Sequence, residues 1–449
     1  MRVSRELVQR LEVAAPRYTS YPTVPAWSDA FGPDDHARAL VEAAAAADEP
    51  LSLYVHIPFC KELCTYCGCN VVITRDQGRV ERYLATLGQE LAMTAARLGR
   101  RRTLTRLHFG GGTPTFLDER QLTQLWSDIT AQFTVAADAE VAIEVDPVVT
   151  SAAQLALLGG FGFNRISMGV QDFDPIVQRA VNRVQSVEET RDAIAHARSV
   201  GFRSVNLDLI YGLPHQTTES FARTMDTIVG LGPDRVACFS FAHVPAVRPN
   251  QRRLPLAAIP TGADKLALLE VAQDRLAAAG YRAIGMDHFA LADDELARAQ
   301  AARTLWRDFQ GYTTQRARAT VAVGASSISD FGDAYAQNEH ALGQYEAAIA
   351  AGRHATVKGI WLTADDRRRR DIITQIMCNG WVDLGADGER TFARELAALE
   401  GAERDGLVAA RGREILLTEL GRVFVRNVAM VFDAYLTPAA GRRVFSATV

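Results

Sequence analysis

Six short β-rich runs alternate with longer helical patterns between about residues 51 and 284, and this alternation constrains the fold more than any other feature. The runs are LSLYVHI (51–57), LTRLHF (104–109), VAIEV (141–145), NRISMGV (164–170), RSVNLDLI (203–210) and RVACFSF (235–241). Amphipathic stretches such as Val80–Leu98, Glu119–Phe133 and Val187–Val200 separate them. Regular alternation of this kind predicts βαβ units, with a parallel sheet covered by helices. Runs such as VNLDLI are apolar on nearly both faces, which is typical of buried parallel strands.

Candidate functional motifs follow the first four predicted strands. A cysteine-rich loop follows the first, GGGTPT the second, Asp146-Pro147 the third and Gln171-Asp172 the fourth. Parallel α/β folds carry functional residues on loops at the carboxyl ends of their strands, in barrels and in doubly wound sheets alike. The alternation alone therefore leaves both architectures open and places the site at one end of either.

The flanking regions differ from this alternating core. The first 45 residues contain PRYTSYPT and an Ala-rich helical stretch, Asp35–Ala47. After about residue 355 we expect a smaller, mainly helical domain with a hairpin in LVAARGREILLTEL, and its predicted helices are Ala364–Asn379, Thr391–Asp405 and Arg422–Leu436. We therefore predict three parts: an arm at 1–45, a core domain at 46–354 and a C-terminal domain at 355–449.

The charge balance argues against nucleic acid as a partner. The formal net charge is −4 over 449 residues, whereas phosphate binding needs a clustered surplus of Lys and Arg. A basic run, Arg367 to Arg370, is flanked by acidic residues, which favours a solvated helix face. No stretch approaches the roughly 20 apolar residues of a membrane span, and MRVSRELVQRLEVAAP lacks the apolar centre of a signal peptide. We therefore expect a cytoplasmic protein.

Four of the six cysteines lie within ten residues, in YVHIPFCKELCTYCGCN. Clustered cysteines in a chain too large to need disulfides indicate a metal or redox site. A structural zinc site normally uses two separated pairs of ligands. A redox pair, Cys64-x-x-Cys67, normally begins a helix without a third cysteine, so both of these are minor alternatives. The C-x3-C-x2-C spacing of Cys60, Cys64 and Cys67 favours an iron–sulfur cluster with one iron open to another ligand.

The other cysteines are interpreted differently. Cys69 follows Cys67 after a single glycine, so two thiolates from this segment on one cluster would strain the loop. We therefore treat Cys69 as a non-ligand. Cys238 and Cys378 lie in apolar runs and are expected to be packed thiols without a chemical role.

Two further features indicate a small-molecule site near the cysteines. The glycines of Gly110-Gly111-Gly112-Thr113-Pro114 either let the backbone approach a ligand closely or form an ordinary turn. The segment lacks the Gly-Lys-Ser/Thr ending of a Walker loop. Glu144 and Asp208 each interrupt an apolar strand, where a buried carboxylate needs a partner. A cationic or hydroxyl-bearing ligand would supply that partner, as would a neighbouring arginine.

The cysteine loop resembles the signature of the radical S-adenosylmethionine superfamily. It carries C-x3-C-x-aromatic-C directly after a first strand, with Tyr66 immediately before Cys67. The resemblance implies a [4Fe–4S] cluster held by Cys60, Cys64 and Cys67, whose open iron binds the amino-acid end of S-adenosylmethionine. One-electron cleavage of this cofactor would yield a 5′-deoxyadenosyl radical, so the cofactor carries the difficult chemistry and the protein orients it.

A closer resemblance covers nearly the whole chain. Long motifs are similar to those of the oxygen-independent coproporphyrinogen III oxidase family: PRYTSYPT, YVHIPFCKELCTYCGCN, HFGGGTPT, EVDP, SMGVQDFDPIVQRAVNRVQS, NLDLIYGLPHQT, GMDHFA, DFQGYTTQ and DAYAQNE. This resemblance implies a partial (β/α)6-type barrel of parallel strands, an N-terminal arm and a mainly helical C-terminal domain. It also implies two S-adenosylmethionine molecules in one site. The implied reaction converts two propionates of coproporphyrinogen III to vinyl groups, giving protoporphyrinogen IX in haem biosynthesis.

The same resemblance assigns roles to single positions. Tyr54 and Glu144 are expected to be catalytic. The positions expected around the first cofactor are Tyr54, Gly111, Gly112, Thr113, Glu144, Gln171, Arg183, Asp208, Ala242 and Ile328, and those linked to the second are Tyr66, Phe309 and Gln310. Two departures border the substrate region. Asp308 stands where the family usually has asparagine, and Phe241, where a tyrosine often stands, begins a shortened segment.

Partners and alternatives also follow from the resemblance. The four carboxylates of the porphyrinogen suggest Arg or Lys at the cavity mouth. The chemistry requires an electron donor and an acceptor that the sequence does not identify, and we expect a monomer. A haem-binding chaperone and a radical haem methyltransferase are the alternatives within the superfamily. The PRYTSYPT arm and the Cys67–Cys69 ending favour the oxidase over the chaperone.

Overall fold

The computed structural model describes residues 5–46 and 48–436. Its main layer is a twelve-stranded sheet with the order β16-β15-β14-β13-β1-β4-β5-β6-β7-β8-β10-β9. The six predicted strands are consecutive in this order, and neighbours among them are parallel. They are β1 (Leu51–Ile57), β4 (Thr103–Gly111), β5 (Thr134–Val145), β6 (Arg165–Gln171), β7 (Ser204–Tyr211) and β8 (Arg235–Ser240). The predicted partial (β/α)6-type barrel is therefore confirmed.

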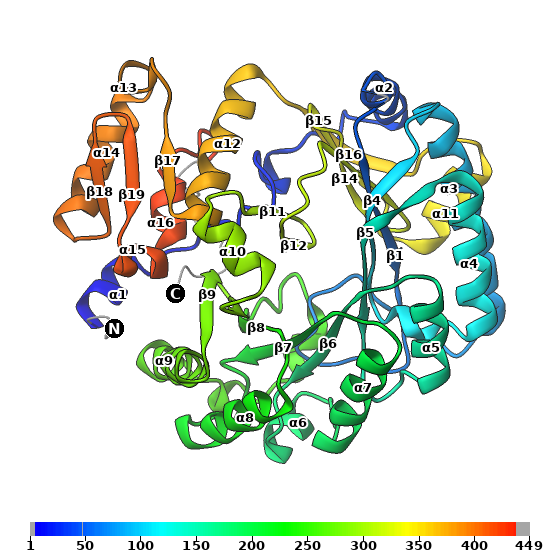
Figure 1. Ribbon diagram of the computed structural model, residues 1–449, viewed down its shortest axis with the longest axis horizontal. Helices are drawn as coiled ribbons and strands as arrows, with labels where there is room; N and C mark the ends of the chain where they lie inside the picture. Colours follow the sequence, from blue (N-terminus) through cyan, green and yellow to red (C-terminus); the bar gives the residue numbers. More distant parts are fainter. Residues whose placement is uncertain (1–4, 47, 437–449) are drawn as a thin grey trace.

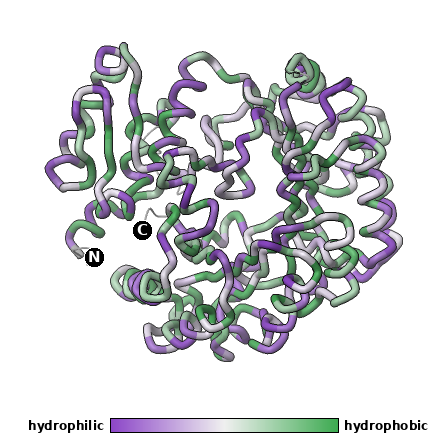
Figure 2. Tube along the Cα trace, in the orientation of Figure 1, coloured by the Kyte–Doolittle hydropathy of each residue, from purple (hydrophilic) through white to green (hydrophobic). Residues whose placement is uncertain are grey.

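Helices cover the outer face of these strands, as the alternation predicts (Figure 1). They are α3 (Gln77–Leu98), α4 (Glu119–Gln132), α5 (Ala152–Gly160), α7 (Val187–Ser199) and α8 (Thr218–Leu231). Figure 2 shows apolar and polar residues alternating along their turns, as in amphipathic helices. Each begins after a side chain that accepts a backbone N–H and so caps the first turn; the caps are Asp76, Asp118, Ser151, Ser186 and Thr217.

Both edges of the sheet contain strands that the alternation did not indicate. At one edge, β13 (Ala319–Val323) pairs in parallel with β1, and β14 (Ile328–Asp330), β15 (Ala334–Asn338) and β16 (Thr356–Trp361) continue antiparallel. At the other edge, β10 (His288–Leu291) and β9 (Tyr281–Gly285) are also antiparallel. Most of these strands are joined by short turns, so they produce no strand–helix pattern. Because β16 ends at Trp361, the sheet extends beyond residue 355, where we predict that the C-terminal domain begins. The division of the chain into three parts stays a prediction.

A second hydrophobic core joins the C-terminal region to the N-terminal arm. It contains Ile376, Phe392 and Phe424 from the C-terminal region, and Tyr18 and Tyr21 from the arm. The elements around it are α12 (Ala364–Asn379), β17 (Trp381–Asp383), α13 (Gly388–Thr391), α14 (Ala393–Arg404), β18 (Val408–Arg411), β19 (Glu414–Leu417), α15 (Glu419–Val423) and α16 (Val425–Met430). The predicted hairpin is β18–β19. The arm therefore packs on the C-terminal region.

The predicted helix Arg422–Leu436 is wrong in its extent. The structure has two short helices there, α15 and α16, with Phe424 between them at φ −103° and ψ 27°. Phe424 is fully buried in the second core. The predicted end of the Ala-rich helix at Ala47 lies outside the described residues; the helix there, α2, is Pro33–Ala44.

The basic run on α12 is a solvated face only in part, because Arg367 and Arg368 are partly exposed whereas Arg369 and Arg370 are mostly buried. Every guanidinium pairs with a carboxylate: Arg367 with Asp333 at 3.1 Å, Arg368 with Asp387 at 2.6 Å, Arg369 with Glu395 at 2.9 Å and Arg370 with Asp330 at 3.6 Å. The side chains of Arg369 and Arg370 are only 14% and 13% exposed. Because the carboxylates belong to different elements, the run ties α12 to the sheet edge and to the C-terminal helices.

The remaining elements connect these layers. They are α1 (Arg5–Leu11), β2 (Phe59–Cys60), β3 (Val72–Ile73), α6 (Pro175–Ala180), α9 (Gly262–Ala278), α10 (Glu295–Ala301), β11 (Trp306–Asp308), β12 (Gly311–Thr313) and α11 (Leu342–Ala350). In the part of the chain that the structure describes, none of the helices has the length and apolar character needed to cross a bilayer.

Two buried histidines stack where the Ala-rich helix meets the sheet edge. The rings of His36 and His354 are 4.2 Å apart and nearly parallel. His36 Nδ1 contacts the Thr356 hydroxyl at 2.7 Å, whereas neither ring nitrogen of His354 has a hydrogen-bond partner among the described residues. Burial, reinforced by the Arg97 charge, lowers the pKa of His354 to about 4. Burial also holds the pKa of His36 well below its usual value. Both rings are therefore neutral in the folded protein near pH 7.

Replacing His354 with phenylalanine is expected to make the protein less sensitive to acid. Below pH 6.5 the unfolded chain binds protons that the buried ring takes up only near pH 4, so the free energy of unfolding falls as the pH drops between these values. For His354 this loss amounts to about 3 kcal/mol. The measurement is denaturant unfolding from pH 7 to pH 4, with the exposed His196→Phe as a control. Parallel pH profiles for His354→Phe and the parent would contradict the expectation.

Candidate active site

A cavity of about 600 Å³ opens at the carboxyl ends of the barrel strands. It is lined by all four clustered cysteines and by most of the residues predicted to bind cofactor. The predicted residues in its lining are Cys60, Cys64, Tyr66, Cys67, Gly111, Gly112, Thr113, Glu144, Gln171, Arg183 and Asp208. The structure thus gathers side chains from the cysteine loop and four successive strands around one space. It does so because parallel strands present their carboxyl ends at the same edge.

Five predicted residues are not in the lining of this cavity among the described residues. Tyr54 lies beside it on β1, where its hydroxyl contacts His56 Nδ1 at 3.1 Å and its ring stacks on His108. Phe309 and Ile328 pack in a cluster with Trp27 and Tyr335. The carbonyl of Ala242 accepts a hydrogen bond from Gln251. The side-chain carbonyl oxygen of Gln310 is buried without a hydrogen-bond partner in the described structure.

The cysteine loop is held by backbone contacts from three directions. The Val72 amide donates to the Pro58 carbonyl at 2.7 Å, which pairs the two ends of the loop. The Thr65 amide donates to the Val181 carbonyl at 3.0 Å. Asn250 donates to the carbonyls of Thr65 and Cys67 at 3.1 and 3.0 Å. Sequence reasoning missed Asn250, because the contact spans more than 180 positions and no local pattern marks it.

The thiols of the loop differ in their ease of ionisation. Burial raises the pKa of Cys60 to about 11, although a contact with the Thr113 hydroxyl opposes it. Burial also raises the pKa of Cys64, and the nearby Arg183 charge opposes it. By contrast, hydrogen bonding from Cys69 lowers the pKa of Cys67 to about 6 against the effect of burial. The Cys69 amide lies 3.4 Å from Cys67 Sγ. Cys69 thus acts as a donor to Cys67 in this arrangement.

The three thiols fit an iron–sulfur cluster better than a single ion. Cys60, Cys64 and Cys67 face one cavity. Within the described residues, however, no three His, Cys, Asp or Glu side chains converge as ligands of one metal ion. In a four-iron cluster each thiolate binds a different iron, so the ligands stand further apart. Coordination would also remove the thiol protons, because a coordinating thiol is deprotonated. Cys238 and Cys378 are buried elsewhere, as predicted.

Glu144 has a partner that the sequence did not indicate. Its carboxylate accepts from His108 Nε2 at 3.1 Å and from the Gly111 amide at 3.2 Å, rather than from an arginine. Burial disfavours ionisation, but these two hydrogen bonds outweigh it and lower the pKa of Glu144. A carboxylate held ionised at the cavity wall can accept from an ammonium or hydroxyl group of a ligand. His108 directly precedes the FGGG motif, and that position was its only signal in the sequence.

The glycine segment is required by packing inside the protein. A Cβ atom on Gly110 would lie 2.9 Å from the Glu144 carboxyl, and one on Gly112 would lie 2.7 Å from the Phe59 carbonyl oxygen. Gly111 has φ +115°, and a Cβ there would lie 2.6 Å from the His56 ring. These contacts account for the three glycines without a ligand. Gly111 and Gly112 nevertheless line the cavity, so their exposed backbone stays available to one.

Asp208 and Arg183 provide opposite charges in the lining of the cavity. Asp208 accepts from Ser167 at 2.9 Å and from Asn206 at 2.7 Å. Burial, together with the charge of Glu144, raises the pKa of Asp208 to about 6 despite these bonds. Arg183 pairs with Asp146 at 2.9 Å and lies 4.0 Å from Cys64 Sγ. The site thus presents carboxylates on two strands and a guanidinium beside the cysteines.

The two departures from the family pattern have different surroundings. Asp308 forms an ion pair with Arg106 on β4, deep in the barrel. Phe241 is buried, and its carbonyl accepts from Lys265 Nζ at 3.0 Å. The Asp308 side chain therefore belongs to a polar network, and the Phe241 ring packs in a small apolar cluster.

Comparison with known proteins agrees with this fold and site. Residues 54–228 match the radical SAM superfamily, which defines the class: a barrel with a three-cysteine loop after its first strand. An oxygen-independent coproporphyrinogen III oxidase of Pseudomonas aeruginosa is 44% identical, over 100% of this chain and 99% of that protein. An oxygen-independent coproporphyrinogen III oxidase of Escherichia coli is also 44% identical, over 99% of this chain and 98% of that protein. The chain belongs to the oxygen-independent coproporphyrinogen III oxidase family.

A solved structure supports the same assignment. Coproporphyrinogen III oxidase of Escherichia coli, described as a radical SAM enzyme, shares 43% sequence identity with this chain. The two superpose with a TM-score of 0.92, covering 97% of this chain and 100% of that one. Family membership implies a [4Fe–4S] cluster and S-adenosylmethionine as cofactors, and the cysteine-lined cavity has the donors to hold them.

Proposed function

We propose that this chain catalyses the oxidative decarboxylation of two propionate side chains of coproporphyrinogen III, giving protoporphyrinogen IX. The observation that carries the proposal is the cavity in which three cysteines meet Glu144, Arg183 and Asp208. Full-length similarity to coproporphyrinogen III oxidases supports the choice of substrate. In each conversion the propionate loses carbon dioxide, one hydrogen atom and one electron, and it becomes a vinyl group.

Cys60, Cys64 and Cys67 would hold the [4Fe–4S] cluster and leave one iron free for S-adenosylmethionine. When bound, the cluster and S-adenosylmethionine would together supply the radical that removes the hydrogen atom from the propionate. Glu144 is already ionised and oriented by His108 and Gly111, so it can accept from the cofactor without rearranging. Tyr54 stacks on His108 and keeps that ring in place. Glu144 is therefore our proposed catalytic residue, and Tyr54, which the resemblance also marks as catalytic, is proposed to act through His108.

The other predicted positions complete the proposed binding site. Gln171, Arg183 and Asp208 line the same cavity as Glu144 and would surround the first S-adenosylmethionine. Tyr66, Phe309 and Gln310 would contact a second molecule. Electrons must enter from a donor and leave to an acceptor, both from outside this chain. We further propose that the protein works as a cytoplasmic monomer.

The proposal is tested anaerobically with the reconstituted protein. Supplied with S-adenosylmethionine, a reductant, an electron acceptor and coproporphyrinogen III, it is expected to form protoporphyrinogen IX and 5′-deoxyadenosine together. Chromatography of both products is the measurement, and heat-inactivated protein is the control. Cleavage of S-adenosylmethionine with the porphyrinogen untouched would overturn the oxidase assignment but keep the radical core. Tight haem binding without turnover would favour a carrier instead.

A further inference from the structure

A second cavity, of about 370 Å³, lies beside the barrel where α9, β9 and the C-terminal region meet. Its lining includes parts of α9, β9, α12, α15 and α16, together with Arg17 of the arm (Figure 1). Within the described residues, it shares no lining residue with the cysteine cavity. Tyr211 lines this cavity and Asp208 lines the other, and side chains three residues apart on one strand point to opposite faces of a sheet. The two cavities therefore lie on opposite sides of β7.

The body of this second cavity is apolar. Its apolar side chains include Leu269, Ile284, Met286, Ile376, Leu417 and Val423. Ala283 on β9 is also in the lining and is exposed, so the cavity opens to solvent on that side. Small-molecule sites are typically concave, about 300–1,000 Å³ in volume, with apolar walls and a few converging polar groups. The second cavity has the size and the walls of such a site.

Three arginines from separate elements bring positive charge to the lining. They are Arg17 of the arm, Arg422 on α15 and Arg426 on α16, against the two carboxylates of Asp287 and Glu419. Arg17 already pairs with Asp287. Glu419 and Arg422 are exposed, which places them at the rim, whereas Arg426 is buried. The lining thus has a surplus of one positive charge, with a guanidinium both at the rim and in the interior.

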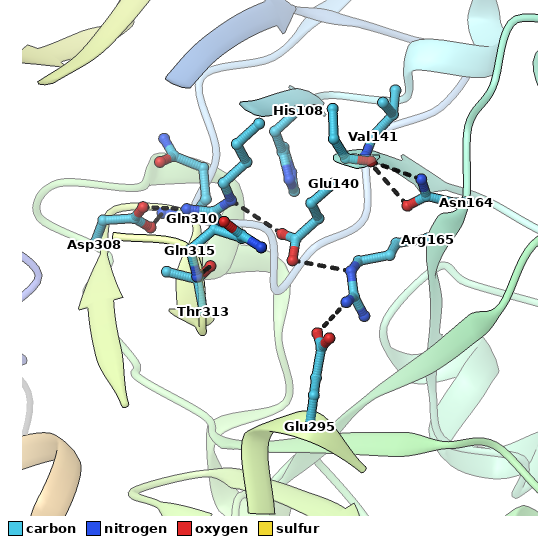
Figure 3. Close-up of polar contacts among 12 residues, drawn as sticks. His108, Glu140, Val141, Asn164, Arg165, Glu295, Asp308, Gln310, Thr313 and Gln315 are labelled. Atoms are coloured by element: carbon cyan, nitrogen blue, oxygen red, sulfur yellow. Dashed lines mark hydrogen bonds and ion pairs between the residues drawn. The ribbon is translucent and has the colours of Figure 1, made fainter. Parts of the chain in front are cut away.

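Guanidinium groups inside the barrel are arranged differently, because carboxylates enclose them. Figure 3 shows Arg165 between Glu140 and Glu295, and its Nε lies 2.9 Å from the Glu140 carboxylate. On the other side of Glu140, Arg106 pairs with that carboxylate and with Asp308. Although burial opposes it, the charges of Asp308 and Glu140 raise the pKa of Arg106. Compensated cations of this kind need no ligand.

Arg426 has different electrostatic surroundings. Its Nη1 donates to the Ala15 carbonyl at 3.1 Å. Burial, reinforced by the charge of Arg17, lowers the pKa of Arg426 to about 10. The guanidinium is still protonated near pH 7, but its charge is disfavoured where it lies. A negative group in the cavity would offset that penalty, since a nearby opposite charge favours the charged form.

We propose that the second cavity binds a small organic anion with an apolar body and one acidic head group. The body would contact the apolar walls, and the head group would pair with Arg422 and Arg426. A single negative charge matches the surplus of one positive charge, whereas a polyphosphate would need more cations and fewer apolar walls. The site requires neither the cluster nor S-adenosylmethionine. The inference therefore goes beyond the proposed function and does not depend on it.

The test uses two fluorescent probes with the reconstituted protein. 1-Anilinonaphthalene-8-sulfonate is an apolar monoanion, and N-phenyl-1-naphthylamine has the same rings without the sulfonate. The anionic probe is expected to bind at one site. Arg426→Met should weaken its binding about tenfold while changing binding of the neutral probe by less than about twofold. Arg282→Met, at an exposed arginine of β9 outside the lining, is the matched control and should change neither.

Ala283→Phe is a second variant, which keeps Arg426 and decides the question if Arg426→Met does not fold. Its ring would fill the open side of the cavity and should abolish binding of both probes, while thermal unfolding checks that each variant is folded. Unchanged binding in Ala283→Phe, or equal losses of both probes in Arg426→Met, would overturn the inference. Displacement of the anionic probe by S-adenosylmethionine or coproporphyrinogen III would also overturn it, because the probe would then occupy the cysteine cavity.

Discussion

Replacing Cys64 with serine is expected to abolish cluster assembly and reduce activity by more than about a hundredfold. Removing groups that merely orient a metal's ligands already costs 10- to 100-fold, and Cys64 is one of only three proposed protein ligands. A serine hydroxyl is a much poorer ligand for iron than a thiolate. The same result is expected for Cys60 and Cys67, because all three face the one cavity. Iron and sulfide content, with the visible absorption of the reconstituted protein, measure the effect.

Cys69→Ser is the informative control for this series. Cys69 lies two residues from Cys67 and donates to its sulfur, so the variant should keep a full four-iron cluster. A second control, Cys238→Ser, changes a thiol that is fully buried away from the cavity. Loss of the cluster in Cys69→Ser would make Cys69 a ligand and would require a different arrangement of the loop. Retention of the cluster in Cys64→Ser would contradict the three-ligand site.

Gly111→Ala is expected to destabilise the site and weaken S-adenosylmethionine binding at least tenfold. Alanine rarely adopts the φ of +115° found at this position, and such strain costs about 1–3 kcal/mol. Its Cβ would also lie 2.6 Å from the His56 ring, which is buried and contacts Tyr54. Relief of the clash requires moving that ring or the backbone that donates to Glu144. Thermal unfolding and equilibrium binding of S-adenosylmethionine measure the two effects.

Gly160→Ala provides the comparison for Gly111→Ala. Gly160 ends α5, has no heavy atom within 4 Å of a built Cβ, and does not have a positive φ. Alanine should therefore stabilise the protein by about 0.5–1 kcal/mol, since it reduces the freedom of the unfolded chain. Equal effects of the two substitutions would show that the tight packing around Gly111 has no energetic consequence.

Much of the barrel could be predicted because its signals are local. The alternation of short β-rich runs with helical patterns marked all six parallel strands, and β1 begins and ends at the predicted residues, Leu51 and Ile57. Helix α12 likewise matches its predicted range. The edge strands were missed because they are short and mostly joined by turns. The break at Phe424 was missed because the apolar spacing of Phe424, Val425, Val428, Ala429 and Phe432 also suits one continuous helix.

The candidate site was likewise predictable only in part. Most of the residues predicted from the cysteine spacing and the strand-end motifs lie in the lining of one cavity, since a parallel α/β fold brings strand ends together. The partners of those residues were not predictable. Glu144 is oriented by His108 and a backbone amide, and Arg367 to Arg370 pair with carboxylates on other elements. A contact of this kind depends on strand order and register, which no local pattern encodes.

By itself, the sequence determined the strand–helix alternation, the three-cysteine loop and, through resemblance, the family. These depend on residues close together along the chain or on long shared motifs. Only the tertiary structure decided that Asp308 bridges Arg106 and Gln310, residues that lie on separate elements. It also showed that the glycines after β4 are required by Glu144, His56 and Phe59. The physical reason is that charge compensation and close packing are properties of three-dimensional neighbours, whose identity is set only when the whole sheet has formed.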